Sequence, residues 1–261
     1  MRKICYPLTI FALSILAACS TTSGSDISLI PTQTDAVTQK KGAFTQPLKW
    51  SGHKPGCEGQ CPKLEIDSLV FPGQRALTER VDHLLAAMLS QFDTDRLLPT
   101  LDEYQEYYWQ VAGPADEALA AAKTIYRNKY LTTLELSAWK YHTGAAHGMS
   151  GTQYLNWSNQ EQQPLSLDDL LEPRQKDRFI ELQKQAHAQW LGKLDFAQED
   201  PEQYLRQWPF QPTDNVAITD AGLLLKYQPY EIAPYAAGMP QLLIPYGSLK
   251  GVIKSRYLPD R

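Results

Sequence analysis

The sequence lacks the features that mark several large classes of protein. After residue 18 it has no hydrophobic stretch long enough to cross a bilayer, which argues against a polytopic membrane protein. It has no excess of basic residues, since 25 Lys and Arg stand against 29 Asp and Glu. This balance argues against binding to nucleic acid or to anionic lipid surfaces through charge.

Motifs of the common enzyme classes are also missing. The chain has no phosphate-cradling glycine loop and no dinucleotide fingerprint. Ser150 lies in Gly-Met-Ser-Gly, which does not match the Gly-x-Ser-x-Gly elbow of serine hydrolases. The adjacent acids Asp168 and Asp169 suit the cap of a helical turn better than an acid/base pair for glycoside hydrolysis. We therefore predict a non-enzymatic protein that uses no cofactor.

Residues 1–18 have the pattern of a bacterial lipoprotein signal. Arg2 and Lys3 precede an apolar run that has the length of a signal-peptide core and is too short to span a bilayer. The run ends in Leu-Ala-Ala before Cys19, and small polar residues follow, which resembles a lipobox. We predict that acylated Cys19 anchors the mature chain in a membrane. The alternative is an ordinary secretory signal with a stray cysteine.

The segment after the anchor indicates where the protein lies and how it is organised. Ser20 resembles the outer-membrane sorting pattern, so we expect a cell-envelope protein facing the periplasm or the cell surface. Removal of residues 1–18 takes away two positive charges and moves the formal net charge from −4 to −6, which suits a basic partner. Residues 19–46 have few large apolar side chains and are predicted to form a flexible stalk. Residues 47–261 form either one domain or two interlocked subdomains, 47–120 and 121–261.

Only two of the four cysteines remain available after processing and acylation, namely Cys57 and Cys61. An oxidising envelope favours a local disulfide between them. A zinc site would need two further ligands, and no His-x-x-His or second cysteine pair lies nearby. A thioredoxin-like role would need a two-residue spacing at a helix start. The pair is therefore predicted to be structural.

The rest of the chain mixes strand and helix patterns without a regular alternation. Apolar and polar residues alternate over residues 63–71, as in a half-buried strand, and apolar residues recur at helical spacing over residues 74–92. Further helices are predicted at 100–111 and 173–194, with short helical turns within 165–171 and 248–253. Further strands are predicted at 123–129, 130–142, 152–159, 216–219, 223–227 and 242–246. This order predicts an α+β fold with a mixed, largely antiparallel sheet packed by a few amphipathic helices.

Two histidines, His142 and His147, flank Thr-Gly-Ala-Ala. A metal site would also need a carboxylate, such as Glu231 or Asp169. The spacing is not that of a helical His-Glu-x-x-His motif, and no acid lies between the histidines. A turn whose glycines and histidine organise backbone hydrogen bonds is the competing interpretation. We predict the turn and no metal.

The most unusual segment is 227–240, which is rich in tyrosine, proline and alanine. Prolines reduce the entropy that a loop loses when it docks, and tyrosines supply rigid contact area. The segment therefore suits a recognition loop. The alternative is that its tyrosines cover the edge of a sheet.

Several pieces of the sequence together carry a family resemblance. They are Tyr-x-Thr-Gly-Ala-Ala-His-Gly, Leu-Asn-Trp, Leu-Ser-Leu-Asp-Asp-Leu-Leu, Tyr-Glu-Ile-Ala-Pro-Tyr-Ala-Ala-Gly and a late Ile-Pro-Tyr. The chain resembles the RsiV-type family from about Lys63 to Ile253. These extracytoplasmic domains are best known from the anti-sigma factor RsiV, which senses lysozyme by binding it. The resemblance implies an α+β fold and occlusion of the lysozyme cleft.

The resemblance and the loop chemistry together single out contact residues for a ligand. They are Tyr230, Glu231, Pro234 and Tyr235, with His147 in support. RsiV-like signalling also needs a cytoplasmic sigma-binding segment and a transmembrane helix, neither of which we expect here. Only ligand binding therefore carries over, and an acidic chain would attract basic lysozyme at low salt.

The leading hypothesis is a lipoprotein that captures lysozyme or a related muramidase. A second hypothesis is a factor that binds peptidoglycan or another envelope protein, for which an aromatic residue such as Trp157 would lie exposed in a groove. A third is a hydrolase whose site is assembled from distant residues, with metal at the two histidines or a buried pair of carboxylates.

Overall fold

The structure is a computed structural model that describes residues 45–94 and 96–258. The predicted signal, Cys19 and all but the last two residues of the predicted stalk lie outside the described residues. No helix in the described part of the chain is both long enough and apolar enough to span a bilayer.

The first half of the described chain builds a six-stranded sheet in the order β1-β2-β3-β4-β5-β6. Only β2 and β3 are parallel neighbours, because two helices connect them, and every other pair is antiparallel. Strand β6 pairs only with the last three residues of β5. The strands are β1 (Gln46–His53), β2 (Lys63–Val70), β3 (Glu117–Arg127), β4 (Leu131–Tyr141), β5 (Met149–Ser158) and β6 (Gln163–Leu165).

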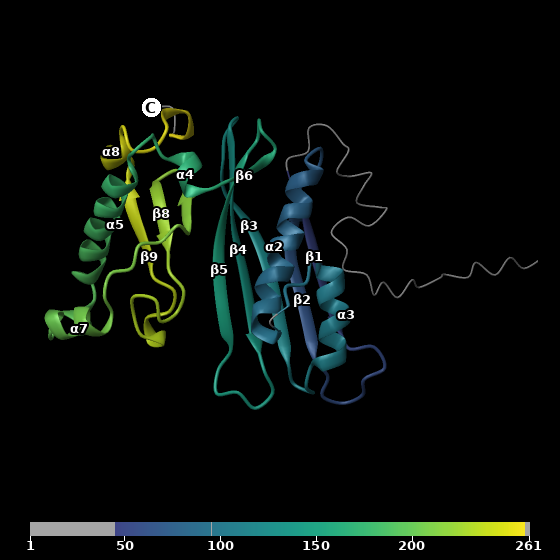
Figure 1. Cartoon of the computed structure of the whole chain (residues 1–261). Helices are drawn as coiled ribbons and strands as arrows, with labels where there is room; N and C mark the ends of the chain where they lie inside the picture. Colours follow the sequence, from purple (N-terminus) through teal and green to yellow (C-terminus); the bar gives the residue numbers. More distant parts are fainter. Residues whose placement is uncertain (1–44, 95, 259–261) are drawn as a thin grey trace, which may run out of the picture.

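Helices α2 (Arg75–Asp93) and α3 (Leu101–Val111) cover one face of this sheet (Figure 1). Helix α2 packs mainly on β3 and β4, and its apolar stripe forms the first hydrophobic core with the inward residues of the strands. The hydroxyl of Thr100 accepts a hydrogen bond from the Glu103 amide and so caps α3. Helix α2 also contacts β5.

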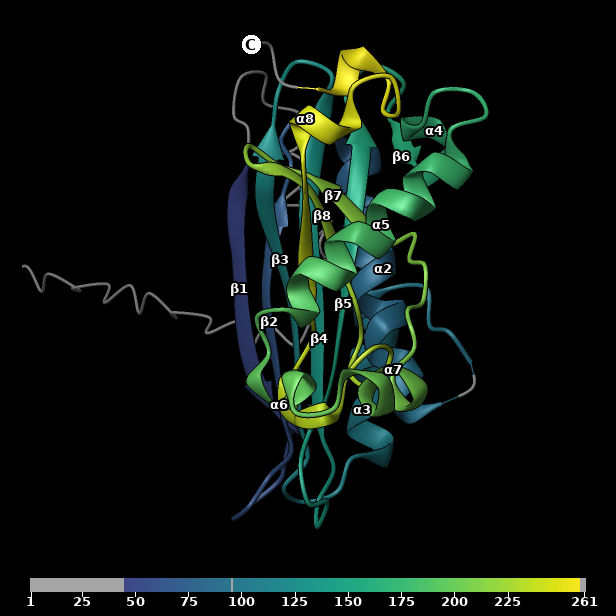
Figure 2. The same cartoon turned by 90° about the vertical axis from the view of Figure 1, so that its left-hand side faces the viewer.

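The second half of the chain adds a smaller sheet, β7-β8-β9, with α5 on its outer face (Figures 1 and 2). Its own hydrophobic core includes Phe179, Leu225 and Ile244. The strands are β7 (Val216–Ile218), β8 (Gly222–Lys226) and β9 (Gln241–Pro245). The helices are α4 (Leu167–Leu170), α5 (Lys176–Leu191), α6 (Asp195–Gln198), α7 (Pro201–Gln207), α8 (Tyr246–Leu249) and the short 3-10 turns η1 (Tyr235–Ala237) and η2 (Ser255–Tyr257).

The two sheets lie face to face and are joined by buried polar side chains as well as by apolar packing. Asn156 on β5 donates to the Val216 carbonyl at 2.7 Å and accepts from the Ile218 amide at 3.3 Å. Its amide thus ties the large sheet to β7. The large sheet ends in the sequence with β6, and the small sheet begins with β7. Residue 120 lies inside strand β3. The subdivision into 47–120 and 121–261 stays a prediction.

The predicted α+β class with a largely antiparallel sheet is confirmed. The disulfide between Cys57 and Cys61 is also confirmed, with sulfurs 2.05 Å apart in the β1–β2 connection. Strand β1 was not predicted, and β3 begins at Glu117 rather than at residue 123. The proline-rich connection after α5 contains α6 and α7, which were also missed.

Candidate functional site

A cavity of about 670 Å³ lies beside the free half of β5. Its walls come from the end of α2, the β4–β5 turn, the segment before β7 and the segment after β8. Its volume lies in the range typical of ligand pockets. Residues from β5 and from these four segments line it, among them Phe92, His147, Gln153, Asn215 and Tyr230.

Side-chain amides cap the edge of β5 where β6 does not reach. The Thr152 amide donates to Gln228 Oε1 at 3.0 Å, and the Thr152 carbonyl accepts from Gln228 Nε2 at 2.6 Å. Asn215 accepts from the Tyr154 amide at 2.7 Å and donates to the Thr152 carbonyl at 2.9 Å. The two amides imitate a neighbouring strand, so this part of the edge is closed to strand addition.

Four aromatic rings form a continuous row at the mouth of the cavity, which we call the aromatic rim: His147, Tyr235, Tyr230 and Trp208. The centroids of His147 and Tyr235 lie 4.3 Å apart in a stacked arrangement. Tyr230 lies 5.6 Å from Tyr235 and 6.4 Å from Trp208. The Tyr235 hydroxyl donates to the Gly148 carbonyl at 3.0 Å, which fastens the loop to the β4–β5 turn.

Tyr230 stands out in the rim because it is 57% exposed and its φ is 70°. A left-handed backbone costs a residue with a Cβ free energy that glycine would avoid. Glu231 supports the turn, since its carboxylate accepts from the Gln228 amide at 2.7 Å. Glu231 is thus occupied within the loop. Pro234 is half-buried and precedes η1.

The β4–β5 turn holds His147 in place. Gly144 has φ 83°, and the Ala145 amide donates to the His142 carbonyl at 2.9 Å. A Cβ at Gly148 would collide with the indole of Trp139, so only glycine allows this close approach. The predicted glycine/histidine turn is therefore confirmed.

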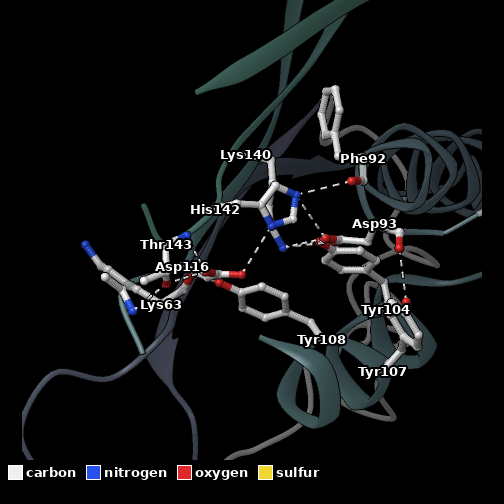
Figure 3. A network of polar contacts seen from close by, with 11 residues as sticks. Lys63, Phe92, Asp93, Tyr104, Tyr107, Tyr108, Asp116, Lys140, His142 and Thr143 are labelled. Carbon is white, nitrogen blue, oxygen red and sulfur yellow. Dashed lines mark hydrogen bonds and ion pairs between the residues drawn. The ribbon is translucent and has the colours of Figure 1, made fainter. Parts of the chain in front are cut away.

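A second cluster of polar groups is buried behind the cavity, at the end of α2 (Figure 3). Lys140 Nζ lies 2.8 Å from an Asp93 carboxylate oxygen, and the two side chains are 0% and 3% exposed. The Tyr104 hydroxyl donates to the same carboxylate at 2.6 Å, and the ammonium lies 4.1 Å from the centroid of the Tyr108 ring. Burial lowers the pKa of Lys140 against the opposing effect of Asp93.

His142 belongs to this buried cluster, whereas His147 belongs to the aromatic rim. Its ring nitrogens lie 3.6 Å from Asp93 and 3.4 Å from Asp116. Burial alone would raise the pKa of Asp116, but hydrogen bonds from the Thr143 hydroxyl and amide hold it below its usual value. Because the Lys140–Asp93 pair is closed to solvent, we interpret the cluster as a structural support of the cavity wall.

The structure brings together three of the five predicted contact residues, His147, Tyr230 and Tyr235, around one cavity. Glu231 and Pro234 belong to the same loop without lining it. Among residues 45–94 and 96–258 no group of three or more His, Cys, Asp or Glu side chains is placed to hold a metal.

The exposed Trp157 that would favour the second hypothesis is not found, and several site residues were missed. Trp157 is 2% exposed in the first core, because its position on β5 faces the helices, so it cannot stack on a ligand. Trp208, Asn215 and Gln228 were not predicted, although Gln228 stands inside the tyrosine- and proline-rich segment that was singled out.

Comparisons with known proteins give a family. The family described as "Protein of unknown function (DUF3298)" matches residues 168–247, and a search of the curated proteins found no match. A solved DUF3298 family protein from Bacteroides fragilis NCTC 9343 shares the fold, with 21% identity, a TM-score of 0.60, and 81% of this chain and 92% of that chain covered. A DUF3298 family protein from Pseudomonas aeruginosa PAO1 is 33% identical, with a TM-score of 0.75, and the match covers 86% of this chain and 100% of that chain. The chain therefore belongs to the DUF3298 family.

Proposed function

We propose that the protein is a non-enzymatic lipoprotein of the cell envelope, anchored through Cys19, that binds lysozyme or a related muramidase at the aromatic rim. The observation that carries this proposal is the row of rings from His147 to Trp208 at the mouth of the cavity, in which His147 and Tyr230 are exposed and Tyr235 and Trp208 are half-buried. Rigid aromatic side chains are the usual anchors of protein interfaces. The RsiV-type resemblance motivates the choice of ligand.

An acidic segment beside the rim supports a basic partner. Residues 195–207, which contain α6 and α7, carry four acidic residues and one arginine. The hydroxyl of Tyr204 on α7 donates to the Ile232 carbonyl at 3.1 Å, which ties this segment to the recognition loop (Figure 2). Such a charge next to an aromatic contact surface would speed the encounter with a basic protein.

The proposal is tested by calorimetric titration of the full chain in detergent micelles with c-type lysozyme at low and high salt. We expect 1:1 binding with a Kd in the micromolar range or tighter, weaker at high salt. Tyr230→Ala should weaken binding by about tenfold, because it removes an exposed anchor and leaves the backbone turn unchanged. Val111→Ala, which shortens a similarly exposed apolar side chain on α3, should have no effect.

A charge-reversal variant tests the acidic segment separately. Glu199→Lys with Glu202→Lys should lower the association rate and reduce its salt dependence. The absence of both heat and a shift in Tm at low salt would remove lysozyme as the ligand. Binding that is unchanged in Tyr230→Ala would place the contact elsewhere on the molecule.

A further inference from the structure

We propose that the cavity behind the aromatic rim binds a short neutral oligosaccharide. This inference goes beyond lysozyme binding and does not depend on it, because the sugar would be held by amides inside the cavity as well as by the rings at its mouth. It rests on the charge of the lining, on two unpaired amides and on the closed edge of β5.

The first observation is the near absence of charge. Among the described residues that line the cavity, Asp214 is the only carboxylate, and no Lys or Arg lines it. A phosphate, a nucleotide or an acidic peptide would therefore enter without a cation to compensate its charge. An uncharged polar ligand suits this lining.

The second observation is a pair of amides that point at no partner. Gln91 on α2 and Gln153 on β5 both line the cavity and are exposed, and neither side chain has a hydrogen-bond partner within the described part of the chain. Each amide offers two donors and an acceptor. The rings of His147, Tyr230 and Tyr235 line the same cavity.

This pairing of rings and amides matches the chemistry of a sugar. A pyranose ring presents C–H groups on its faces, which pack on aromatic rings, and hydroxyl groups at its edge, which exchange hydrogen bonds with amides. An extended peptide would instead need backbone groups of a strand edge. Gln228 and Asn215 already occupy those groups at Thr152 and Tyr154.

The test is calorimetric titration of the full chain in detergent micelles with chitotriose and, separately, with cellotriose. We expect 1:1 binding of at least one of the two sugars with a Kd below about 1 mM. Gln91→Ala and Gln153→Ala should each weaken it about fivefold, as the loss of a hydrogen bond predicts. Gln185→Ala, an exposed glutamine on α5 away from the cavity, is the matched control and should bind like the wild type.

The outcomes separate this inference from the proposed function. Absence of heat with both sugars up to about 10 mM would overturn the oligosaccharide site, whether or not lysozyme binds. Sugar binding that survives in both glutamine variants would place the sugar elsewhere and overturn it as well. Lysozyme binding should be unchanged in Gln91→Ala and Gln153→Ala, because these amides lie inside the cavity and not on the rim.

Discussion

The side chain of Gln228 forms hydrogen bonds with both backbone polar groups of Thr152, 76 residues earlier in the chain. Thr152 is buried on β5, which pairs with β4 on one side but has no neighbouring strand on its other edge at this point, so the amide and carbonyl on that edge need partners. Asn215 completes the arrangement at Tyr154. The same contacts that protect the edge also shape one wall of the cavity.

Loss of these amides should both destabilise the protein and open the edge. We expect Gln228→Ala to lower the free energy of unfolding by about 1–3 kcal/mol, because it leaves the buried Thr152 amide without a partner, while the Thr152 carbonyl keeps its bond from Asn215. Gln228→Ala with Asn215→Ala should also associate through the exposed strand. Urea denaturation and sedimentation velocity measure the two effects.

Gln163→Ala is the control for the edge, since the side chain of this exposed glutamine forms a hydrogen bond with the Glu161 side chain and none with the backbone of β5. Its effect on stability should stay below about 0.5 kcal/mol. A double variant that remains monomeric and as stable as this control would show that the amides are not needed to protect β5.

The buried pair of Lys140 and Asp93 gives a second prediction. Asp93→Asn or Lys140→Met alone should cost about 3–5 kcal/mol, because each leaves a buried charge without its partner. The two substitutions together should cost clearly less than the sum of the single effects. Chemical denaturation of the wild type, the two single variants and the double variant completes this double-mutant cycle. Strictly additive losses would mean that the two charges do not interact.

Strand alternation explains which parts of this support could be predicted. Leu134, Leu136, Ala138 and Lys140 share one face of β4, so the pattern places the lysine toward the core. Its partner Asp93 lies 47 residues earlier at the end of a helix, and no local pattern links the two. Elements and their order follow from local periodicity, whereas long-range polar pairs depend on the packing of the sheets.

In the candidate site, too, some residues could be predicted from local sequence, whereas others depend on how the sheets pack. The tyrosine- and proline-rich segment pointed to Tyr230 and Tyr235, because composition alone marks a rigid recognition loop. Asn215 and Gln228 gave no such sign, since their role arises only where β5 lacks a neighbour. Whether Trp157 lies exposed could not be predicted, because an aromatic residue on a strand faces either side of the sheet, and its side is fixed by strand register.

Asp82 predicts how stability changes with pH. Burial, together with the acidic neighbours Asp102 and Glu103, raises the pKa of this α2 carboxyl to about 7 despite the opposing hydrogen bond from the Leu101 amide. The unfolded chain loses the proton near pH 4, so the folded state holds a proton between pH 4 and pH 7 that the unfolded state has released. This component of stability is complete below pH 4 and is lost as the pH rises through 7.

Asp82→Asn keeps an oxygen for the Leu101 amide and removes the titration. Its free energy of unfolding should match that of the wild type near pH 4 and exceed it at pH 8 by an amount on the order of 4 kcal/mol. Denaturation curves across this range test the sign. Asp67→Asn, at an exposed ion pair, should show a small difference across the range. A difference in the free energy of unfolding between Asp82→Asn and the wild type that stays constant from pH 4 to pH 8 would show that Asp82 has an ordinary pKa in the folded protein.

Because the backbone of Tyr230 is left-handed, two substitutions can separate the contribution of its ring to binding from the free-energy cost of its backbone conformation. Tyr230→Ala and Tyr230→Gly both remove the ring, but only glycine relieves the strain at φ 70°. We expect the glycine variant to be more stable than the alanine variant by about 1 kcal/mol, and both to bind lysozyme equally weakly. Thermal unfolding and calorimetry measure the two quantities.

Gly238 provides a control for strain in the same loop, because its φ of 70° and ψ of −139° lie in a region that favours glycine, and a Cβ added there would meet no other atom within 4 Å. Gly238→Ala should therefore cost about 1–3 kcal/mol of stability through backbone strain alone. If Tyr230→Gly is no more stable than Tyr230→Ala while Gly238→Ala shows this cost, the turn at 230 is held by its neighbours without strain. If Tyr230→Gly is more stable than Tyr230→Ala, as expected, the native tyrosine occupies a backbone position that lowers the stability of the fold. Its exposed ring is then explained by contact with a ligand rather than by the fold.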